Sequence, residues 1–436
     1  MAKCDVAIIG GGILGTSISY WLSSLYDIKT CVIEKESEVA IHASSRNTGI
    51  VHSPFYLDPQ KKKILAKSAF LSYDLWKSFA EKRGLGWKMV GTLEVALDED
   101  QHKSLEKYMT WGVQNGISEN DLELLDRNDV LQKEPNVSCH SALFCKRDAV
   151  VDYGTFTREL KKESQKNGTE FLLKHKVESI QKNEKGSLIT FQNNEQLHAD
   201  LIINCAGGHS LDVAKKFGLA KEYSDLHFRG EYWIAQKEYA NLVKTNIYSV
   251  ASFPDFPFLD PHWILRSDGR SEVGPNAVPV PSSETYSGYG DVGTLISKLS
   301  EIVTGNARKL LLNPDFISLI SKEWLSSISK TAMIERVQQF IPKIKPAYFA
   351  ERGTAGIRSS IITPEGTFLP DVMELESSNS YHILNYNSPG ATGAPAYSAY
   401  VVKKLQEKGL LNYTLHPKAT IWNFEKIIAK LNILSN

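Results

Sequence analysis

Three glycines and one acid near the amino end have the spacing of a phosphate-binding turn. Gly10, Gly12 and Gly15 form the pattern Gly-x-Gly-x-x-Gly, and Glu34 ends the next apolar run. In this pattern the glycines allow a tight turn, a close approach of backbone to pyrophosphate, and close packing of a helix on a strand. The carboxylate of Glu34 can bind a ribose hydroxyl and would repel a 2′-phosphate. The spacing therefore predicts a site for NAD or FAD and disfavours NADP.

The apolar pattern predicts the elements that position this turn. Residues 5–9 and 30–34 are β-branched apolar runs typical of buried parallel strands, and residues 13–26 have helical apolar spacing. A further strand is predicted over 199–205, and the turn Ala206-Gly207-Gly208 follows it. The position of the motif at the amino end, together with this second glycine turn, favours FAD over NAD.

The middle of the chain has a different pattern. Short alternating runs such as 91–96 predict antiparallel strands, aromatic-rich runs over 228–276 predict a second sheet that builds a pocket, and 281–350 is largely helical by pattern. We predict an α/β fold (α+β overall) in which a Rossmann-like FAD-binding domain is interleaved with an antiparallel-sheet substrate domain. The predicted segments are 1–80, 141–225 and 351–410 for the FAD-binding domain, 81–140 and 226–350 for the substrate or cap domain, and 411–436 for a carboxyl-terminal tail helix.

Seven further stretches carry distinctive combinations of residues. They are Ser45–His52 (SRNTGIVH), Val151–Tyr153, Phe228–Trp233 (FRGEYW), Phe256–Leu259, Gly274–Val278 (GPNAV), Ala355–Arg358 and Asn387–Thr392. With the glycine motif they resemble the FAD-dependent oxidoreductases of the D-amino acid oxidase superfamily, and most of all the L-2-hydroxyglutarate dehydrogenase group. The resemblance covers residues 3 to about 403.

The motif and the resemblance together imply which residues hold FAD. The implied cofactor-binding residues lie on the two glycine turns, on the second strand and on four later segments. They are Gly10, Gly12, Ile13, Leu14, Gly15, Glu34, Lys35, Ser44, Ser45, Arg46, Asn47, Thr48, Gly49, Val177, Ala206, Gly207, Gly356, Arg358, Pro389, Gly390, Ala391 and Thr392.

Oxidation of a 2-hydroxy acid needs a hydride acceptor, a base for the hydroxyl proton and a cation for the carboxylate. The resemblance supplies flavin as the acceptor, with hydride transfer to its N5. His52 and His262 each adjoin a matching stretch and are the candidate bases, because imidazole titrates near neutral pH. Arg358 is the candidate carboxylate clamp. The alternatives are structural histidines and an interdomain ion pair for Arg358.

The resemblance implies oxidation of L-2-hydroxyglutarate to 2-oxoglutarate. Two departures bear on the substrate: Arg46-Asn47-Thr48-Gly49 stands where the group often has His-Asn-Ser-Gly, and Asp260–Trp263 stands where it usually has Val-His-Phe-Thr. The alternative substrates are malate, glycerol 3-phosphate, or an amino acid or amine. A flavin-binding subunit without catalysis is a further alternative from another functional class.

Charge and cysteine usage exclude several classes of protein. The 436 residues carry 50 Lys+Arg and 50 Asp+Glu, so no summed positive field attracts nucleic acid. The five cysteines are odd in number and lack Cys-x-x-Cys spacing, which favours a reducing cytoplasm and predicts no metal site. The uncharged stretch 6–26 contains four glycines and is predicted to be neither a signal peptide nor a membrane span.

The tail at 421–431 is amphipathic, with Trp422 and Phe424 beside lysines. Two placements follow from this pattern. The tail lies on the inner face of a membrane and brings a peripheral enzyme close to quinone, or it packs on the protein's own core. The expected electron acceptor is quinone or oxygen.

Overall fold

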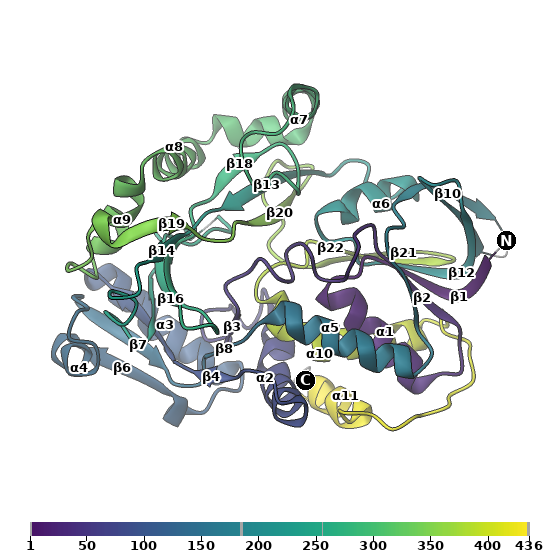
Figure 1. The fold of residues 1–436 in the computed structure, drawn as a ribbon, viewed down its shortest axis with the longest axis horizontal. Helices are drawn as coiled ribbons and strands as arrows, with labels where there is room; N and C mark the ends of the chain where they lie inside the picture. Colours follow the sequence, from purple (N-terminus) through teal and green to yellow (C-terminus); the bar gives the residue numbers. More distant parts are fainter. Residues whose placement is uncertain (1, 184–185, 255, 434–436) are drawn as a thin grey trace.

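The computed structural model describes residues 2–183, 186–254 and 256–433; the ends of the predicted 1–80 and 411–436 segments, residue 1 and residues 434–436, lie outside them. Its first sheet is mixed (Figure 1). The strands in spatial order are β10 (Val177–Asn183), β11 (Gly186–Phe191), β12 (Gln196–Asn204), β1 (Ala2–Ile9), β2 (Thr30–Ile33) and β9 (Glu170–Leu172), with β22 (Ser380–Leu384) beside β12 and β21 (Met373–Ser377) beside β22. The pairs β22–β12, β12–β1, β1–β2 and β2–β9 are parallel.

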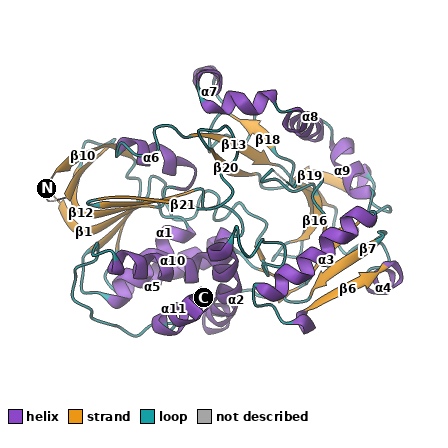
Figure 2. Cartoon of the chain, turned by 180° about the vertical axis from the view of Figure 1, so that it is seen from behind, coloured by secondary structure: helices purple, strands orange, loops and turns teal. Residues whose placement is uncertain are grey.

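Helices cover both faces of this sheet, because alternate residues of its buried strands point to opposite sides. Val6 and Ile8 of β1 pack on one side and Ala7 and Ile9 on the other. The helices of the first side are α1 (Ile13–Leu25), α2 (Lys63–Arg83), α5 (Tyr153–Lys166), α10 (Gly390–Glu407) and α11 (Phe424–Ile433); α6 (Ser210–Lys216) packs on the second side (Figure 2).

The second sheet is mainly antiparallel. Its strands in spatial order are β19 (Phe349–Arg352), β14 (Trp233–Ala235), β17 (Ser271–Gly274), β16 (His262–Leu265), β15 (Asn246–Ser249), β5 (Thr92–Ala96), β7 (Ser141–Cys145) and β6 (Leu122–Asp126). The helices around it and along the outer edge are α3 (Glu99–Gln114), α4 (Arg127–Lys133), α7 (Val292–Thr304), α8 (Pro314–Ile328) and α9 (Lys330–Gln338) (Figure 2).

Two further sheets have three strands each. One contains β18 (Val278–Val280), β13 (Ser224–Gly230) and β20 (Gly356–Ile362), and the other contains β3 (Ile50–Val51), β8 (Ala149–Val150) and β4 (Lys88–Met89). The chain alternates between the two halves, so the predicted mixed and interleaved fold class is confirmed. Strand pairing crosses the predicted domain limits at two places. β7 lies in a segment predicted for the FAD-binding domain but pairs with β5 and β6, which lie in the predicted substrate domain. β20 also lies in a segment predicted for the FAD-binding domain, but it pairs with β13, most of which lies in the predicted substrate domain. The predicted domain limits stay a prediction.

Helix α10 begins at Gly390 and ends at Glu407. Pro395 lies inside it and has no N–H to donate to the carbonyl of Ala391. The indole Nε1 of Trp76 donates to that carbonyl (3.1 Å) and to the carbonyl of Thr392 (3.0 Å). Because a side chain replaces the lost donor, the helix extends across the proline.

The carboxyl-terminal tail packs on the core of the first half. Trp422 is 3% exposed, its ring lies against those of Tyr20 and Trp76, and its Nε1 donates to the carbonyl of Leu75. Phe424, with Ile427 and Ile428, is buried as well. Of the two predicted placements, the structure shows packing on the core for these four side chains. Within the described ranges, no helix has the length and apolarity required to cross a bilayer.

Candidate active site

A cleft of about 330 Å³ lies between the two halves of the molecule. Its walls include the start of α1 on one side and residues of β13, β16 and β20 on the other, together with the loop that leads into α10. Long-range folding therefore brings to one place the segments that the sequence marks as distinctive.

The glycine turn has no room for side chains. Gly10 has a φ of +111°, and a Cβ added there would lie 2.3 Å from the carbonyl oxygen of Cys205. A Cβ on Gly15 would lie 2.0 Å from the carbonyl oxygen of Gly10. Gly12, the cap residue of α1, has no side chain, and of the first amides of this helix that of Ile13 is the one bound by a side chain among the described residues. Free amides and the positive end of the helix dipole thus face the cleft, and this end fits a pyrophosphate.

Glu34 stabilises this turn directly. It is 8% exposed, its Oε2 accepts a hydrogen bond from the amide of Gly11 (2.8 Å), and its Oε1 accepts one from the amide of Glu36 (2.9 Å). Ser44 Oγ accepts a hydrogen bond from the amide of Ile13 (2.9 Å). Two separate segments therefore fix the turn and the first residue of α1.

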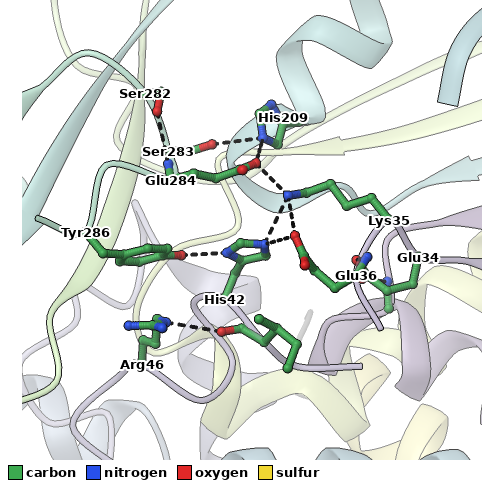
Figure 3. Close-up of polar contacts among 12 residues, drawn as sticks. Glu34, Lys35, Glu36, His42, Arg46, His209, Ser282, Ser283, Glu284 and Tyr286 are labelled. Atoms are coloured by element: carbon green, nitrogen blue, oxygen red, sulfur yellow. Dashed lines mark hydrogen bonds and ion pairs between the residues drawn. The ribbon is translucent and has the colours of Figure 1, made fainter. Parts of the chain in front are cut away.

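A cluster of ion pairs surrounds Lys35, next to Glu34 (Figure 3). Lys35 Nζ lies 2.9 Å from Glu36 Oε1, 3.0 Å from His42 Nε2 and 2.6 Å from Glu284 Oε1. His209 Nε2 lies 2.5 Å from Glu284 Oε1. Hydrogen bonds to Asp212 and Glu284 raise the pKa of His209 to about 9, and the hydrogen bond from His209 lowers the pKa of Glu284. We call these five residues, Lys35, Glu36, His42, His209 and Glu284, the Lys35 cluster.

Arg358 brings a cation into the cleft. It lies on β20, lines the cleft, and donates a hydrogen bond from Nη1 to the carbonyl of Pro257. Among the described residues it forms no ion pair with a carboxylate. Arg229 instead pairs with Glu231 (3.1 Å) and donates to the carbonyls of Thr285 and Gly288. Of these two arginines, Arg358 is therefore the one whose guanidinium can bind an anionic ligand.

His52 lines the cleft and has a carboxylate behind it. Its Nδ1 lies 3.3 Å from Oδ2 of Asp148, which is 0% exposed. The backbone amide of His52 donates to Thr392 Oγ1 (3.2 Å), so the backbone of His52 is held against the first turn of α10.

His262 lines the same cleft in a different environment. It is 1% exposed, its Nδ1 lies 2.9 Å from the carbonyl oxygen of Asp260, and its ring stacks on that of Tyr248 with centroids 3.9 Å apart. Burial lowers the pKa of His262 to about 3, so the ring is neutral at physiological pH. Because Nδ1 donates to a carbonyl, the buried Nε2 is a bare acceptor, and it has no hydrogen-bond partner in the structure.

Most residues predicted to bind the cofactor or substrate lie together on the cleft wall. These are Gly12, Ile13, Leu14, Ser44, Arg46, Asn47, Thr48, His52, Gly207, His262, Gly356, Arg358, Pro389, Gly390, Ala391 and Thr392. The predicted residues that are not on the wall are Gly10, Gly15, Glu34, Lys35, Ser45, Gly49, Val177 and Ala206. Gly10, Gly15 and Glu34 shape the turn, whereas Val177 packs beside the buried side chains of the first sheet.

Sequence patterns gave no signal for two groups around His52. Asp148 precedes the two-residue strand β8, outside the distinctive stretches. Tyr248 lies on β15 and lines the cleft next to His262. Only the pairing of strands that are distant in the sequence brings these side chains to the histidines.

Comparison with known proteins identifies the family. Residues 5–404 match the family described as "FAD dependent oxidoreductase". The chain belongs to the FAD-dependent oxidoreductase family. It is 30% identical over 417 residues to an L-2-hydroxyglutarate dehydrogenase, mitochondrial, of Caenorhabditis briggsae, with 93% of each chain covered. It is 32% identical over 401 residues to an L-2-hydroxyglutarate dehydrogenase of Indibacter alkaliphilus, with 89% of this chain and 96% of the relative covered.

Solved structures show the same fold. The L-alpha-glycerophosphate oxidase of Mycoplasma pneumoniae with FAD bound has a TM-score of 0.74 at 22% identity and covers 97% of this chain and 98% of its own. A glycine oxidase of Geobacillus kaustophilus has a TM-score of 0.69 at 17% identity, with coverage of 95% and 97%. As an FAD-dependent oxidoreductase, this chain has a turn whose shape and free amides fit the pyrophosphate of FAD.

Proposed function

We propose that this FAD-dependent oxidoreductase oxidises a 2-hydroxy acid, L-2-hydroxyglutarate, to the 2-oxo acid, 2-oxoglutarate. The observation that carries the proposal is the pair of Arg358 and His52 in one cleft. Arg358 is a cation without a carboxylate partner among the described residues, and His52 is an imidazole backed by a carboxylate. Relatives that are 30–32% identical over most of their length are named for this substrate.

The reaction removes two hydrogens from the substrate. The O–H bond and the Cα–H bond break, the C=O bond forms, and the two electrons leave with the Cα hydrogen as hydride. FAD, when bound, supplies the hydride acceptor at flavin N5. The protein must therefore hold the carboxylate and take up the hydroxyl proton.

Arg358 holds the substrate carboxylate. A guanidinium offers parallel N–H donors that match a carboxylate, and β20 fixes its backbone beside the cleft. The loop Pro389–Thr392 lies on the same cleft and joins Arg358, Gly12 and Ser44 among the residues that we propose to contact FAD.

His52 takes up the hydroxyl proton. The two candidate bases differ, because only His52 has a carboxylate to stabilise the imidazolium that forms. His262, with a pKa of about 3, is a poor proton acceptor and instead offers a hydrogen-bond acceptor at Nε2. We therefore assign the base to His52 and a substrate-orienting role to His262.

The electrons then pass to quinone or oxygen. Because the tail is buried against the core, we propose no membrane contact through it. Stopped-flow mixing of the reduced enzyme with a soluble quinone or with oxygen measures which of the two reoxidises it faster.

The proposed function is tested by anaerobic bleaching of the flavin in purified protein. The panel contains L- and D-2-hydroxyglutarate, L-malate, glycerol 3-phosphate and amino acids. We expect L-2-hydroxyglutarate to bleach the flavin at the lowest concentration. Bleaching by amines alone would exclude oxidation of a hydroxy acid, and failure of every compound to bleach it would favour a flavin-binding subunit without catalysis.

A further inference from the structure

Asp148 is a buried carboxylate, and each of its two oxygens has hydrogen-bond partners. Oδ1 accepts hydrogen bonds from the amide of Ser53 (2.7 Å) and the thiol of Cys145 (3.6 Å). Oδ2 accepts one from Thr92 Oγ1 (2.8 Å) and faces Nδ1 of His52 at 3.3 Å. No lysine or arginine pairs with it in the part of the chain that the structure describes, so His52 is its one partner there that can become cationic.

The backbone around Asp148 is fixed as well. Its carbonyl oxygen accepts hydrogen bonds from the amides of Val90 (3.1 Å) and Gly91 (2.9 Å). The carboxylate therefore has one orientation, set by a backbone amide on one oxygen and by a hydroxyl on the other. An oriented acceptor at Nδ1 determines which ring nitrogen of a histidine carries the proton.

A second buried carboxyl group, Glu94, lies nearby on β5, and its neighbour across the strands is Tyr248. Burial, reinforced by the charge of Asp148, raises the pKa of Glu94 to about 8. Glu94 is therefore mostly neutral at pH 7 and adds little negative charge behind His52. A carboxylate that is buried without a cation is costly, and this cost falls when the neighbouring imidazole becomes protonated.

We propose that Asp148 is the positioning residue for the proton acceptor: it accepts the Nδ1–H of His52 and so leaves the Nε2 lone pair for the hydroxyl proton of the substrate. This assignment rests on the proposed function for its catalytic consequence. When the O–H bond breaks, the proton goes to Nε2, and Asp148 stabilises the resulting imidazolium without receiving the proton.

The substitution Asp148→Asn tests this assignment because the asparagine side-chain amide can adopt only one of its two flipped orientations at this position. The backbone N–H of Ser53 is a fixed donor, so the amide oxygen must take the place of Oδ1. The amide NH2 then faces Nδ1 of His52. Nδ1 becomes the acceptor, and the proton moves to Nε2, where the ring can no longer accept a proton from the substrate.

The first measurement is the tautomer of His52 in [15N]histidine-labelled holoenzyme. Long-range 1H–15N spectra at pH 8 report which nitrogen is protonated, and His52→Gln assigns the signal. We expect the proton on Nδ1 in the unmodified protein and on Nε2 in Asp148→Asn. A proton on Nε2 in the unmodified protein would overturn the assignment, even if the variant does not fold.

The second measurement is the rate of anaerobic flavin reduction. For Asp148→Asn we expect a loss of about 10²- to 10⁴-fold in the rate, with substrate affinity within about threefold. The matched control is Glu94→Gln, the same change from carboxyl to amide in the same buried region, which should stay within about threefold in both values. A rate for Asp148→Asn close to that of the control would refute the role.

The two proposals can fail separately. If no 2-hydroxy acid reduces the flavin of the unmodified protein, the proposed function fails, and the tautomer measurement still decides whether Asp148 orients His52. If the acid reduces the flavin and Asp148→Asn reduces it equally fast, the proposed function stands and the positioning role fails.

Discussion

The Lys35 cluster and the reaction end of the cleft both hold several ionisable side chains, but they differ in how completely these are paired. In the cluster, each charged group contacts an opposite charge or a hydrogen-bond partner within 3.0 Å (Figure 3). At the reaction end, Arg358 has no carboxylate partner in the described ranges, and His262 Nε2 has no hydrogen-bond partner.

This difference separates a structural cluster from a binding site. Ionisable groups that satisfy one another gain little from a ligand, whereas a half-buried cation and a buried bare acceptor are costly until a ligand contacts them. The unpaired cation at the reaction end matches the carboxylate of a 2-hydroxy acid, and the bare acceptor lies on the wall of the same cleft.

Of the two unpaired groups, Arg358 should give the larger effect when it is replaced. Arg358→Met removes the cation and keeps an unbranched apolar stem, so the substrate carboxylate enters the cleft without a partner. We expect the affinity for the acid to fall by roughly 30- to 5,000-fold, which corresponds to the loss of about 2–5 kcal/mol that follows truncation of one partner of a buried charge pair. The measurement is the dissociation constant of 2-oxoglutarate from perturbation of the flavin spectrum.

Arg358→Lys is the matched control, because it keeps the charge and loses the planar donor pair. Its affinity should lie between those of the unmodified protein and Arg358→Met. If both variants bind the acid as tightly as the unmodified protein does, Arg358 is not the clamp, and its contact with Pro257 is structural.

Replacement of His262 should have a smaller effect. His262→Phe keeps a planar ring and removes the hydrogen-bond acceptor at Nε2 from the cleft, which corresponds to about 0.5–1.5 kcal/mol, or roughly 2- to 13-fold in KM. Because the pKa of His262 is about 3, the ring is neutral throughout pH 5–9, and the pH profile of turnover should keep its shape. A lost or shifted limb in that profile would identify His262 as the titrating base.

The glycine turn could be predicted from the spacing of its residues, whereas at the reaction end the resemblance supplied His52, His262 and Arg358, and nothing in the sequence pointed to Asp148. Gly10, Gly12 and Gly15 act through their own backbone within one strand, turn and helix, so their spacing along the chain reports their spacing in space. His52 and Asp148 are 96 residues apart, and strand pairing rather than spacing brings them together.

The sequence pattern also left the placement of the carboxyl-terminal tail open, and only the packing in the structure resolves it. An amphipathic tail with Trp422 has the same pattern whether its apolar face meets a membrane or a core. The hydrogen bond from Trp422 to Leu75 and its contacts with the rings of Tyr20 and Trp76 show which is the case. The matching surface lies on α1 and α2, far from the tail in the sequence.

The stability of the protein should depend on pH through Glu94. Its pKa in the folded protein is about 8, against an ordinary value of 4.5, so between these values the folded state binds more protons than the unfolded state. Stability from this group is complete below about pH 4.5 and is lost as the pH rises through about 8. The groups around it are Asp148 and three tyrosines, Tyr56, Tyr108 and Tyr248, whose raised pKa values keep them neutral in this range.

Glu94→Gln should remove this dependence. We expect the Tm of the variant to exceed that of the unmodified protein by about 3–6 °C at pH 8.5 and to match it at pH 4.5. Parallel thermal melts across this range measure the difference. An equal gap at both pH values would mean that Glu94 does not change its charge in this window.

The smallest effects should come from the Lys35 cluster. Glu284 is 41% exposed, so Glu284→Gln should cost at most about 1 kcal/mol and leave KM for the acid unchanged. Three potential metal ligands, Glu36, His42 and Glu284, have donor atoms within 4.8 Å of one another, but the ammonium of Lys35 contacts all three. Zinc and EDTA should therefore leave the Tm unchanged, whereas a rise in Tm with zinc would show that the cluster is a metal site and that its pairing is incomplete.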